Sequence, residues 1–288
     1  MVGAFQGGKT RFQAFCFFKV KTPEVSAFNS NVALSDSSTT NLSSSEQFIE
    51  DALWWLEEFD FDGARIDAVK HVEDLAITNV GLDLLGQAEN FLTYAAEIKG
   101  NTNADNLTFK RREQDFRCLH LVQTPNTDFA FILARQFFID VYHKILFSKL
   151  VKSEDLTIKG ISKKAIKEIN YHFQRSSDWI KRLGLGTQES NKRLQNAINE
   201  LWMYTDELFI DNETDLIMSK NNIGPLSSSL KLEWTKIVNS ALNSSEITIP
   251  ESDVYSLRYG KDGFHTEYLG YILAEMQHLP LLYPDASW

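Results

Sequence analysis

The sequence predicts an all-α protein in which long helices pack side by side as a bundle, preceded by an atypical N-terminal segment. Apolar residues recur every three or four positions through most of residues 73–279, which is the period of a helix with one buried face. The connections between these segments are short, which favours antiparallel neighbours. Several of the helical faces also carry a single buried acid, and these acids are the candidate functional residues.

The composition is that of a globular protein and argues against several classes of partner. Of the 288 residues, 43% are hydrophobic and 24% are charged. The net charge of -10 argues against nucleic acid and anionic membrane, since both bind a concentrated basic surface. Cys16 and Cys118 cannot build a disulfide framework, and the apolar run at residues 12–20 is too short to span a bilayer. We therefore expect a cytoplasmic protein.

Residues 1–71 are expected to form a separate N-terminal segment, and residues 72–288 a helical domain. The segment has no sustained period at first and reaches a Ser/Thr/Asn-rich run at residues 29–45, which predicts a loop or tail. The pattern G-x-x-x-x-G-K-T at residues 3–10 resembles a phosphate-binding loop. Such a loop must follow a buried strand, and only two residues precede this one, so it is a weak signal for a nucleotide site.

Residues 43–71 resemble a segment of the alpha-amylase family of glycoside hydrolases, a short amphipathic helix (46–59) followed by a barrel strand written FDFDGARIDAVKH. The resemblance implies that Asp67 is a carboxylate nucleophile, with Arg65 beside it and Lys70-His71 near bound sugar. That chemistry also needs a general acid and the other strands of an eight-stranded barrel. No alternation of strands and helices follows, so we favour an isolated helix and turn without glycosidase activity.

A long, deeply buried helix is predicted for residues 73–100. Its apolar positions step by three or four residues and are Ile77, Val80, Leu84, Ala88, Phe91, Ala95 and Ile98. Gly100 is placed to end the helix in a left-handed conformation. Gly81 and Gly86 each cost roughly 1 kcal/mol inside a helix, so they predict that another backbone packs close by. One carboxylate, Asp83, lies among the leucines.

Residues 107–122 predict a shorter helical piece, and a helix that is apolar nearly all round follows at residues 129–151. Asp128 is a good N-terminal cap for it. A helix without a polar face must be buried. Asp140 therefore points into the core, and His143 lies one turn further along.

The next predicted helix, at residues 156–183, places a carboxylate and an imidazole on its inner face. The positions of that face are Ile161, Ala165, Glu168, His172, Trp179 and Leu183. Thr187 caps the following helix, whose inner stripe is Leu194, Ile198, Leu201 and Leu208. The last predicted helices are 230–242 and 263–279, and residues 211–229 are expected to be a loop apart from 216–219.

Three helices with an inward acid are the outline of a ferritin-like bundle. A carboxylate-bridged di-iron centre in such a bundle takes one Glu from each of two helices and a Glu-x-x-His pair from each of the other two. Asp83 has Gly86 where the histidine would stand, and Glu168 has Tyr171. His172 comes one residue late, and we expect it to hydrogen-bond Glu168 as a neutral core histidine.

Two other pairs do have the required spacing, Asp140-x-x-His143 and Glu275-x-x-His278. Matches of two residues arise by chance in helix-rich chains, and neither is accompanied by the rest of the ligand set. We therefore predict a ferritin-like helical bundle without catalytic or metal-binding residues. The remnants of its metal centre are expected to be Asp83, Asp140, Glu168 and His172.

Long motifs in the right order carry a second resemblance, over about residues 72–288. They are EDLAITNVGLDLLGQA at 73–88, FRCLHLVQTPNTD at 116–128, ARQF at 134–137, KEINYH at 167–172, WIKRLG at 179–184, GTQES at 186–190, HTEYLGYILAEMQ at 265–277, Tyr283-Pro and the terminal Trp288. These motifs resemble the structural C subunits of phenylacetyl-CoA epoxidases (ring 1,2-phenylacetyl-CoA monooxygenases), which act in aerobic phenylacetate degradation.

The resemblance implies a ferritin-like subunit without iron that pairs with a related catalytic subunit of the A type. The di-iron centre of that partner would epoxidise the aromatic ring, using oxygen and electrons from a reductase. It implies neither a nucleic-acid partner nor a membrane partner.

The N-terminal segment departs from that family, which begins with a bundle helix leading directly into the region of Glu73. Either residues 46–59 replace that helix, or the chain is a chimera with one side of its core open. Two other functions also stay open, a di-iron oxygenase in its own right and a fragmentary carbohydrate-active protein.

Overall fold

The computed structural model describes the backbone of residues 64–251 and 259–284, and within these ranges the side chains from residue 77 onward. The chain divides into two units, Met1–Lys19 with Asp83–Trp288 and Val20–Leu82, and the packing described below is that of residues from Asp83 onward. Every regular element in the described ranges is a helix, which confirms the predicted all-α fold class. The predicted helix 46–59 and the loop pattern at 3–10 lie outside these ranges.

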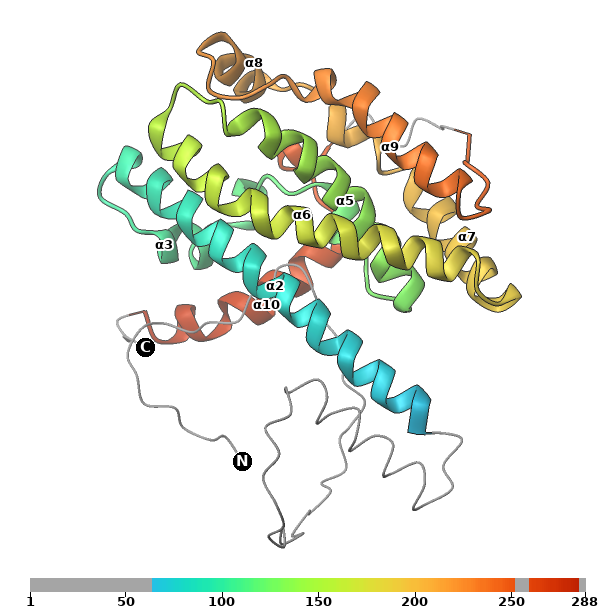
Figure 1. The fold of residues 1–288 in the computed structure, drawn as a ribbon. Coiled ribbons are helices and arrows are strands. Elements are labelled where there is room, and N and C mark those ends of the chain that lie inside the picture. The colour runs from blue at the N-terminus through green and yellow to red at the C-terminus, as the bar shows by residue number, and fades with distance from the viewer. Residues whose placement is uncertain (1–63, 252–258, 285–288) are drawn as a thin grey trace, which may run out of the picture. The chain divides into compact units, whose positions relative to one another are not determined.

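From α2 to α9 the helices follow one another with short connections (Figure 1). The longer ones are α2 (Ala64–Lys99), α5 (Phe129–Leu150), α6 (Leu156–Gly184), α7 (Gln188–Trp202), α9 (Lys231–Asn243) and α10 (Glu267–Leu282). The shorter ones are α3 (Ala104–Phe109), η1 (Glu113–Asp115), α4 (His120–Gln123), η2 (Asp206–Phe209), α8 (Glu213–Lys220), η3 (Ser227–Leu230) and η4 (Gly260–Asp262).

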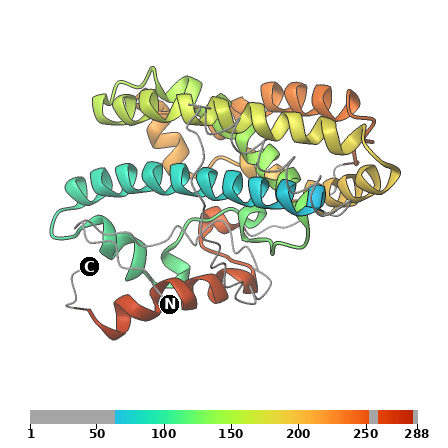
Figure 2. The same cartoon turned by 60° about the horizontal axis from the view of Figure 1, so that its bottom comes forward.

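Helix α5 is the centre of the bundle, because it contacts α6, α7 and α9 (Figures 1 and 2). Its residues are buried on nearly every side, as its continuous apolar sequence predicts. Helices α6 and α7 instead bury one face each and carry most of their charged residues on the other. A tight connection of five residues between α5 and α6 holds the two as neighbours.

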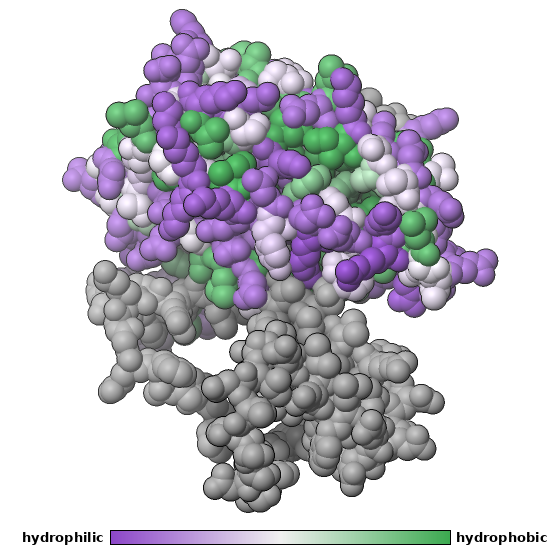
Figure 3. Space-filling model, in the orientation of Figure 1, coloured by the Kyte–Doolittle hydropathy of each residue, from purple (hydrophilic) through white to green (hydrophobic). Residues whose placement is uncertain are grey.

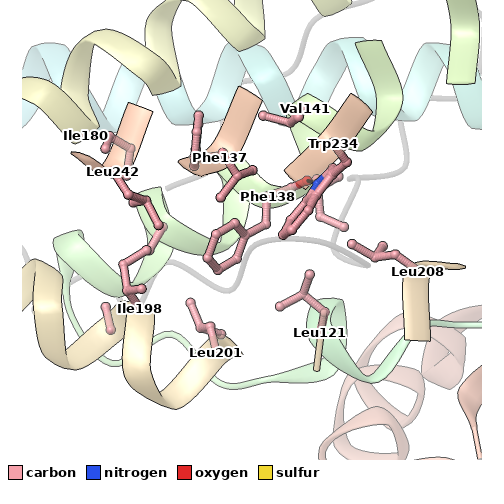
Figure 4. Close-up of a cluster of buried hydrophobic side chains, with 14 of the residues drawn as sticks. Leu121, Phe137, Phe138, Val141, Ile180, Ile198, Leu201, Leu208, Trp234 and Leu242 are labelled. Atoms are coloured by element: carbon pink, nitrogen blue, oxygen red, sulfur yellow. Dashed lines mark hydrogen bonds between the residues drawn. The ribbon is translucent and has the colours of Figure 1, made fainter. Parts of the chain in front are cut away.

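The main core lies between α5, α7 and α9 (Figure 4). Its centre is aromatic: the Phe138 ring lies 5.6 Å from the Trp234 ring and 5.8 Å from the Trp202 ring. The indole of Trp234 is buried, and its Nε1 donates a hydrogen bond to the Phe138 carbonyl oxygen at 3.0 Å. The predicted inner stripe of α7, Leu194, Ile198 and Leu201, faces this core and is fully buried, as is Leu208 in η2.

The sequence also predicted how several helices begin and end. The Asp128 carboxylate accepts from Phe131 N at 2.8 Å at the start of α5, and the Thr187 hydroxyl accepts from Ser190 N at 3.1 Å at the start of α7. Helix α6 ends at Gly184, where a side chain would collide with the backbone of Ser245. Gly100 has a positive φ of 67°, as the predicted C-terminal cap requires.

The prediction for α2 was wrong in three respects. The helix begins at Ala64 rather than near Glu73, so residues 64–71, compared above with a barrel strand, are helical. Its last turns are not deeply buried, since Ile98 is 70% exposed. Among the described residues, nothing beyond its own helix lies within 4 Å of where a Cβ of Gly86 would stand, so no close backbone explains that glycine.

Polar residues explain the error in the buried face of α2. From Leu84 the face that meets the rest of the bundle continues through Gln87, Phe91 and Tyr94 instead of Ala88, Ala95 and Ile98. The Tyr94 hydroxyl donates to the Asp155 carboxylate at 2.6 Å, and Phe91 packs edge-on against Phe147. A search for apolar residues alone passes over such positions.

Two other stretches differ from the prediction. Residues 107–122 do not form one helix, because the backbone is extended at Arg112 and again at Phe116, which separates α3, η1 and α4. The predicted short piece at 216–219 is a complete helix, α8, whose cap is the reciprocal pair of Asn212 and Asp215.

Candidate functional site

The candidate site is a polar cluster between α2, α5 and α6. Asp83 and Gln87 come from α2, Gln136, Asp140 and His143 from α5, and Glu168, His172 and Ser176 from α6. All four residues predicted as remnants of a metal centre belong to it. The structure brings them together in pairs rather than as one set.

His172 and Asp83 form the first pair. The His172 side chain is buried, and its Nε2 lies 2.9 Å from the Asp83 carboxylate. Since a carboxylate only accepts, the imidazole donates this bond through Nε2. The contact ties the middle of α6 to α2 and satisfies a histidine that burial would otherwise leave without a partner.

Glu168 bonds across to α2 as well, which corrects the predicted bond between Glu168 and His172. The Gln87 amide donates to the Glu168 carboxylate at 2.9 Å. Each group on α6 therefore has its own partner on α2, because both side chains face that helix rather than each other. The intrahelical bond expected from a spacing of four residues is replaced by two bonds between helices.

Asp140 is the most deeply buried acid of the cluster. The Gln136 amide donates to its Oδ1 at 2.6 Å, while its Oδ2 has no hydrogen bond of ordinary geometry among the described residues. Burial raises the pKa of the Asp140 carboxyl to about 7, and nearby Ser176 and Gln136 oppose part of this rise. The group is therefore close to half protonated at neutral pH.

His143 lies one turn beyond Asp140 on the same helix. Burial, together with the proximity of His172, lowers the pKa of its imidazole to about 4. Its ring packs edge-on against Phe147 with 5.9 Å between the ring centres. His143 is therefore neutral at physiological pH and packs as part of the core.

The donor set does not fit a carboxylate-bridged di-iron centre. Gly86 offers no ligand atom at the position where α2 would need a histidine, and Tyr171 at the matching position of α6 is 59% exposed. The pair Glu275 and His278 lies on the exposed side of α10, which packs on α3 and η1. Within residues 77–251 and 259–284, no three His, Cys, Asp or Glu side chains are grouped so as to share a metal ion.

Sequence reasoning missed the two glutamines of the cluster. Gln87 stands four residues after Asp83, and Gln136 stands four residues before Asp140. Residues four apart are neighbours on a helix, and Gln with Asp is a stabilising pair there. Amide side chains are poor candidates for metal ligands, so neither glutamine was predicted, although the spacing of four residues from an aspartate indicates both.

A second buried carboxylate, Glu207, serves structure. It accepts from the backbone nitrogens of His120 at 2.8 Å and Lys261 at 3.3 Å. The Lys261 ammonium donates in turn to Ile210 O and to the Asp215 carboxylate, both at 2.8 Å. This network joins α4, η2, α8 and η4.

The described part of the surface carries a further candidate, an open groove between α6 and α9. It has a volume of about 450 Å³ and is lined by Phe173, Ser177, Lys236, Ile237, Ser240 and Ala241. In the view of Figure 3, hydrophilic residues cover most of the described surface and hydrophobic ones form separate patches among them. The groove is open and lacks an acid or a histidine, so it has no evident chemistry.

Comparison with known proteins gives two matches. A family model described as "Phenylacetic acid catabolic protein" matches residues 71–288. The C subunit of the 1,2-phenylacetyl-CoA epoxidase from Escherichia coli (strain K12) is 46% identical over 215 residues, which are 75% of this chain and 86% of that relative. The family match begins at residue 71, so it gives no support to the alpha-amylase resemblance of residues 43–71.

None of the described helices is long and apolar enough to cross a membrane.

Proposed function

The chain belongs to the phenylacetic acid catabolic protein family, and from this we propose that it is the structural, non-catalytic subunit of a multicomponent phenylacetyl-CoA ring epoxidase. It pairs with the related di-iron catalytic subunit and stabilises it. The reductase acts on that partner, and the complex works in the cytoplasm in aerobic phenylacetate degradation. This assignment concerns residues 72–288, the helical domain.

One observation supports the proposal: the acids at two positions that would hold metal ligands, Asp83 and Glu168, are each hydrogen-bonded to a side chain of the neighbouring helix. The Asp83 carboxylate accepts a hydrogen bond from His172, and the Glu168 carboxylate accepts one from Gln87. Both carboxylates are half-buried, and each already has a hydrogen-bond donor from the neighbouring helix. The cluster therefore resembles a set of links between helices rather than a site prepared to receive a cation.

These links supply the cohesion that a metal centre would otherwise provide. Two hydrogen bonds cross from α2 to α6, and the amide bond of Gln136 to Asp140 lies on α5 beside them. Polar links in a low-dielectric interior also fix the register of the helices, because a shifted helix would leave buried groups unpaired. A bundle held in this way can present a fixed surface to a partner.

The alternative function is a di-iron oxygenase in its own right. It is favoured by Asp140 and His143, which have the spacing of a ligand pair and lie in the cluster near His172. Against it, the neighbouring ligand positions hold Gly86 and Tyr171, so such a centre would lack two histidines. A chimeric chain without activity would also match the family but would bind no partner.

The test is reconstitution with the catalytic subunit. The chain alone should not consume phenylacetyl-CoA, and the two subunits expressed together should form a complex that does so when a reductase is supplied. The variant Glu168→Ala should leave turnover per folded complex within about twofold, as should the matched control Asp178→Ala on the exposed side of α6. Turnover by the chain alone, or its loss by a hundredfold or so only in Glu168→Ala, would establish the alternative.

A further inference from the structure

Helix α10 is attached to the rest of the described protein by few buried side chains. It packs on α3 and η1, and in Figure 2 it lies on the side of α3 away from α5, α6 and α9. Its buried side chains form a cluster with residues that precede α4, apart from the main core, and the members are Leu269, Leu273, Met276, Phe109, Phe116 and Cys118. An element with few buried apolar contacts can open locally while the rest of the protein stays folded.

Hydrogen bonds of Gln123, in α4, hold the start of this helix. The Gln123 side chain is 1% exposed, and its Oε1 accepts from Thr266 N at 2.8 Å and from Thr266 Oγ1 at 2.9 Å. Its Nε2 donates to Cys118 O at 2.6 Å and also lies 3.0 Å from Nδ1 of His265. Thr266 is the residue directly before α10, so these bonds fix where the helix begins.

The partners of the Gln123 amide allow only one protonation state of His265. A backbone N–H only donates and a carbonyl oxygen only accepts, so the bonds to Thr266 N and Cys118 O determine which end of the amide is the oxygen. The nitrogen end therefore donates to His265 Nδ1, which must carry no proton. The other ring nitrogen, Nε2, donates to Phe116 O at 3.1 Å. His265 is thus held as the neutral tautomer with its proton on Nε2.

A second proton on His265 would break this contact. It would place an N–H on Nδ1 opposite the N–H of the Gln123 amide, and two donors do not bond each other. Turning the amide over does not restore the bonds, because its oxygen would then face Cys118 O and its nitrogen would face Thr266 N. In both arrangements a buried polar group loses its partner, which destabilises the docked helix.

The surroundings of His265 also favour the neutral ring. Burial lowers the pKa of His265, and the nearby His120 of α4 and Arg117 lower it as well. The Phe116 carbonyl oxygen and the Glu113 carboxylate of η1 favour the charged ring but do not outweigh these effects. His265 therefore stays neutral in the docked helix at pH values where an exposed histidine begins to take up a proton.

We propose that His265 and Gln123 form a proton-sensitive latch, which holds α10 in place at neutral pH and releases it as the pH falls. Protonation of His265 separates the ring from Gln123, and the start of α10 then moves away from α4. The buried face of α10 and the side chains of Phe109 and Phe116 become accessible to solvent. This inference goes beyond the proposed function and concerns the chain by itself.

The test measures how strongly the backbone amides of α10 are protected against hydrogen exchange in the full-length chain, with the amides of α5 as the internal reference. In the released helix His265 has the ordinary histidine pKa of about 6.5. Lowering the pH from 7.5 to 5.5 should therefore reduce the protection factors of α10 several-fold, to at most about tenfold, and leave those of α5 unchanged.

Two variants on the same segment separate the latch from other titrating groups. His265→Asn offers an acceptor to Gln123 and cannot titrate, so the protection of α10 should no longer change between the two pH values. The matched control is His278→Asn, on the exposed side of α10, which should keep the full response. Nuclear magnetic resonance of the unsubstituted chain with 15N-labelled histidine should show His265 with its proton on Nε2 at pH 7.5.

Four results would overturn the inference. They are protection of α10 that does not change with pH in the unsubstituted chain, a change that persists in His265→Asn, a proton on Nδ1 of His265 at pH 7.5, and an equal loss of protection in α5. The last would mean that the whole bundle opens rather than α10 alone.

Discussion

At the scale of single residues, the buried carboxyl group of Asp140 should make the stability of the bundle depend on pH. An aspartate in an unfolded chain has a pKa near ~4, whereas burial raises the pKa of Asp140 to about 7. As pH rises between these values, the Asp140 carboxyl loses its proton in the unfolded chain but keeps it in the folded chain. The contribution of this group to the free energy of unfolding therefore falls from about pH 4 to about pH 7 and is constant above that.

Asp140→Asn should remove this dependence. Asparagine keeps an oxygen for the Gln136 amide and cannot ionise, so the variant should gain stability relative to the parent as pH rises. The gain at pH 8 over pH 5 should be on the order of 2 kcal/mol. Urea unfolding at the two pH values measures it. His143 titrates in both proteins and cancels from the difference, so a difference that is independent of pH would show that Asp140 is not buried as described.

The sequence predicted which residues belong to the candidate site but not which of them form hydrogen bonds with one another. The spacing predicted that Asp83, Asp140, Glu168 and His172 lie on inner faces, and all four lie in one cluster. It did not predict which of them bond, because helix spacing fixes neighbours on one helix and not across two. The Glu168 partner, Gln87, is therefore visible only once α2 and α6 are placed side by side.

At the scale of elements, two glycines of α6 should respond in opposite directions to the same change. A Cβ at Gly184 would meet the backbone of Ser245, whereas nothing lies within 4 Å of that position at Gly160 in the described structure. Gly184→Ala should lower the free energy of unfolding by about 1–3 kcal/mol. Gly160→Ala should raise it by up to about 1 kcal/mol, because alanine is the better helix former.

Thermal or chemical unfolding of the two variants measures the difference, and each serves as the control for the other. Equal stability of the two would mean that the end of α6 does not lie against Ser245. Both substitutions improve the helix propensity of α6 equally. Any difference in stability between the two variants therefore reports the packing at Gly184.

The sequence predicted the helices that have a continuous apolar face. It did not predict the short elements whose ends are set by local hydrogen bonds. The bounds of α5, α6 and α9 and the start of α7 were predicted within a few residues, because each helix has a continuous apolar pattern and three of them have a side-chain cap or a terminal glycine. The end of α7 was predicted wrongly: the helix stops at Trp202, and Leu208, which was expected on its inner stripe, lies in η2. Residues 107–122 were predicted as one shorter helical piece. There the Arg112 and Asp115 pair closes a tight turn instead, which periodicity does not reveal.

At the scale of the whole molecule, one prediction concerns the N-terminal segment, residues 1–71. We predict that deleting residues 1–42 leaves folding and complex formation unchanged, since that stretch has no core pattern. Deleting residues 1–71 removes the first turns of α2 and should cause aggregation, because large uncovered apolar patches associate. Size-exclusion chromatography of both deletions with the catalytic subunit measures this. Equal solubility and binding of the longer deletion would mean that residues 43–71 play no part in the bundle.

The central claim is that this chain holds no di-iron centre and supports a partner that does. It is tested most directly by measuring iron in the full-length chain purified alone from iron-supplemented cells, beside the complex with the catalytic subunit. Because Gly86 and Tyr171 stand where histidine ligands would be needed, the chain alone should hold far less than one iron, and the complex should hold about two per pair of subunits. Two tightly bound irons per chain in the protein purified alone would contradict the account.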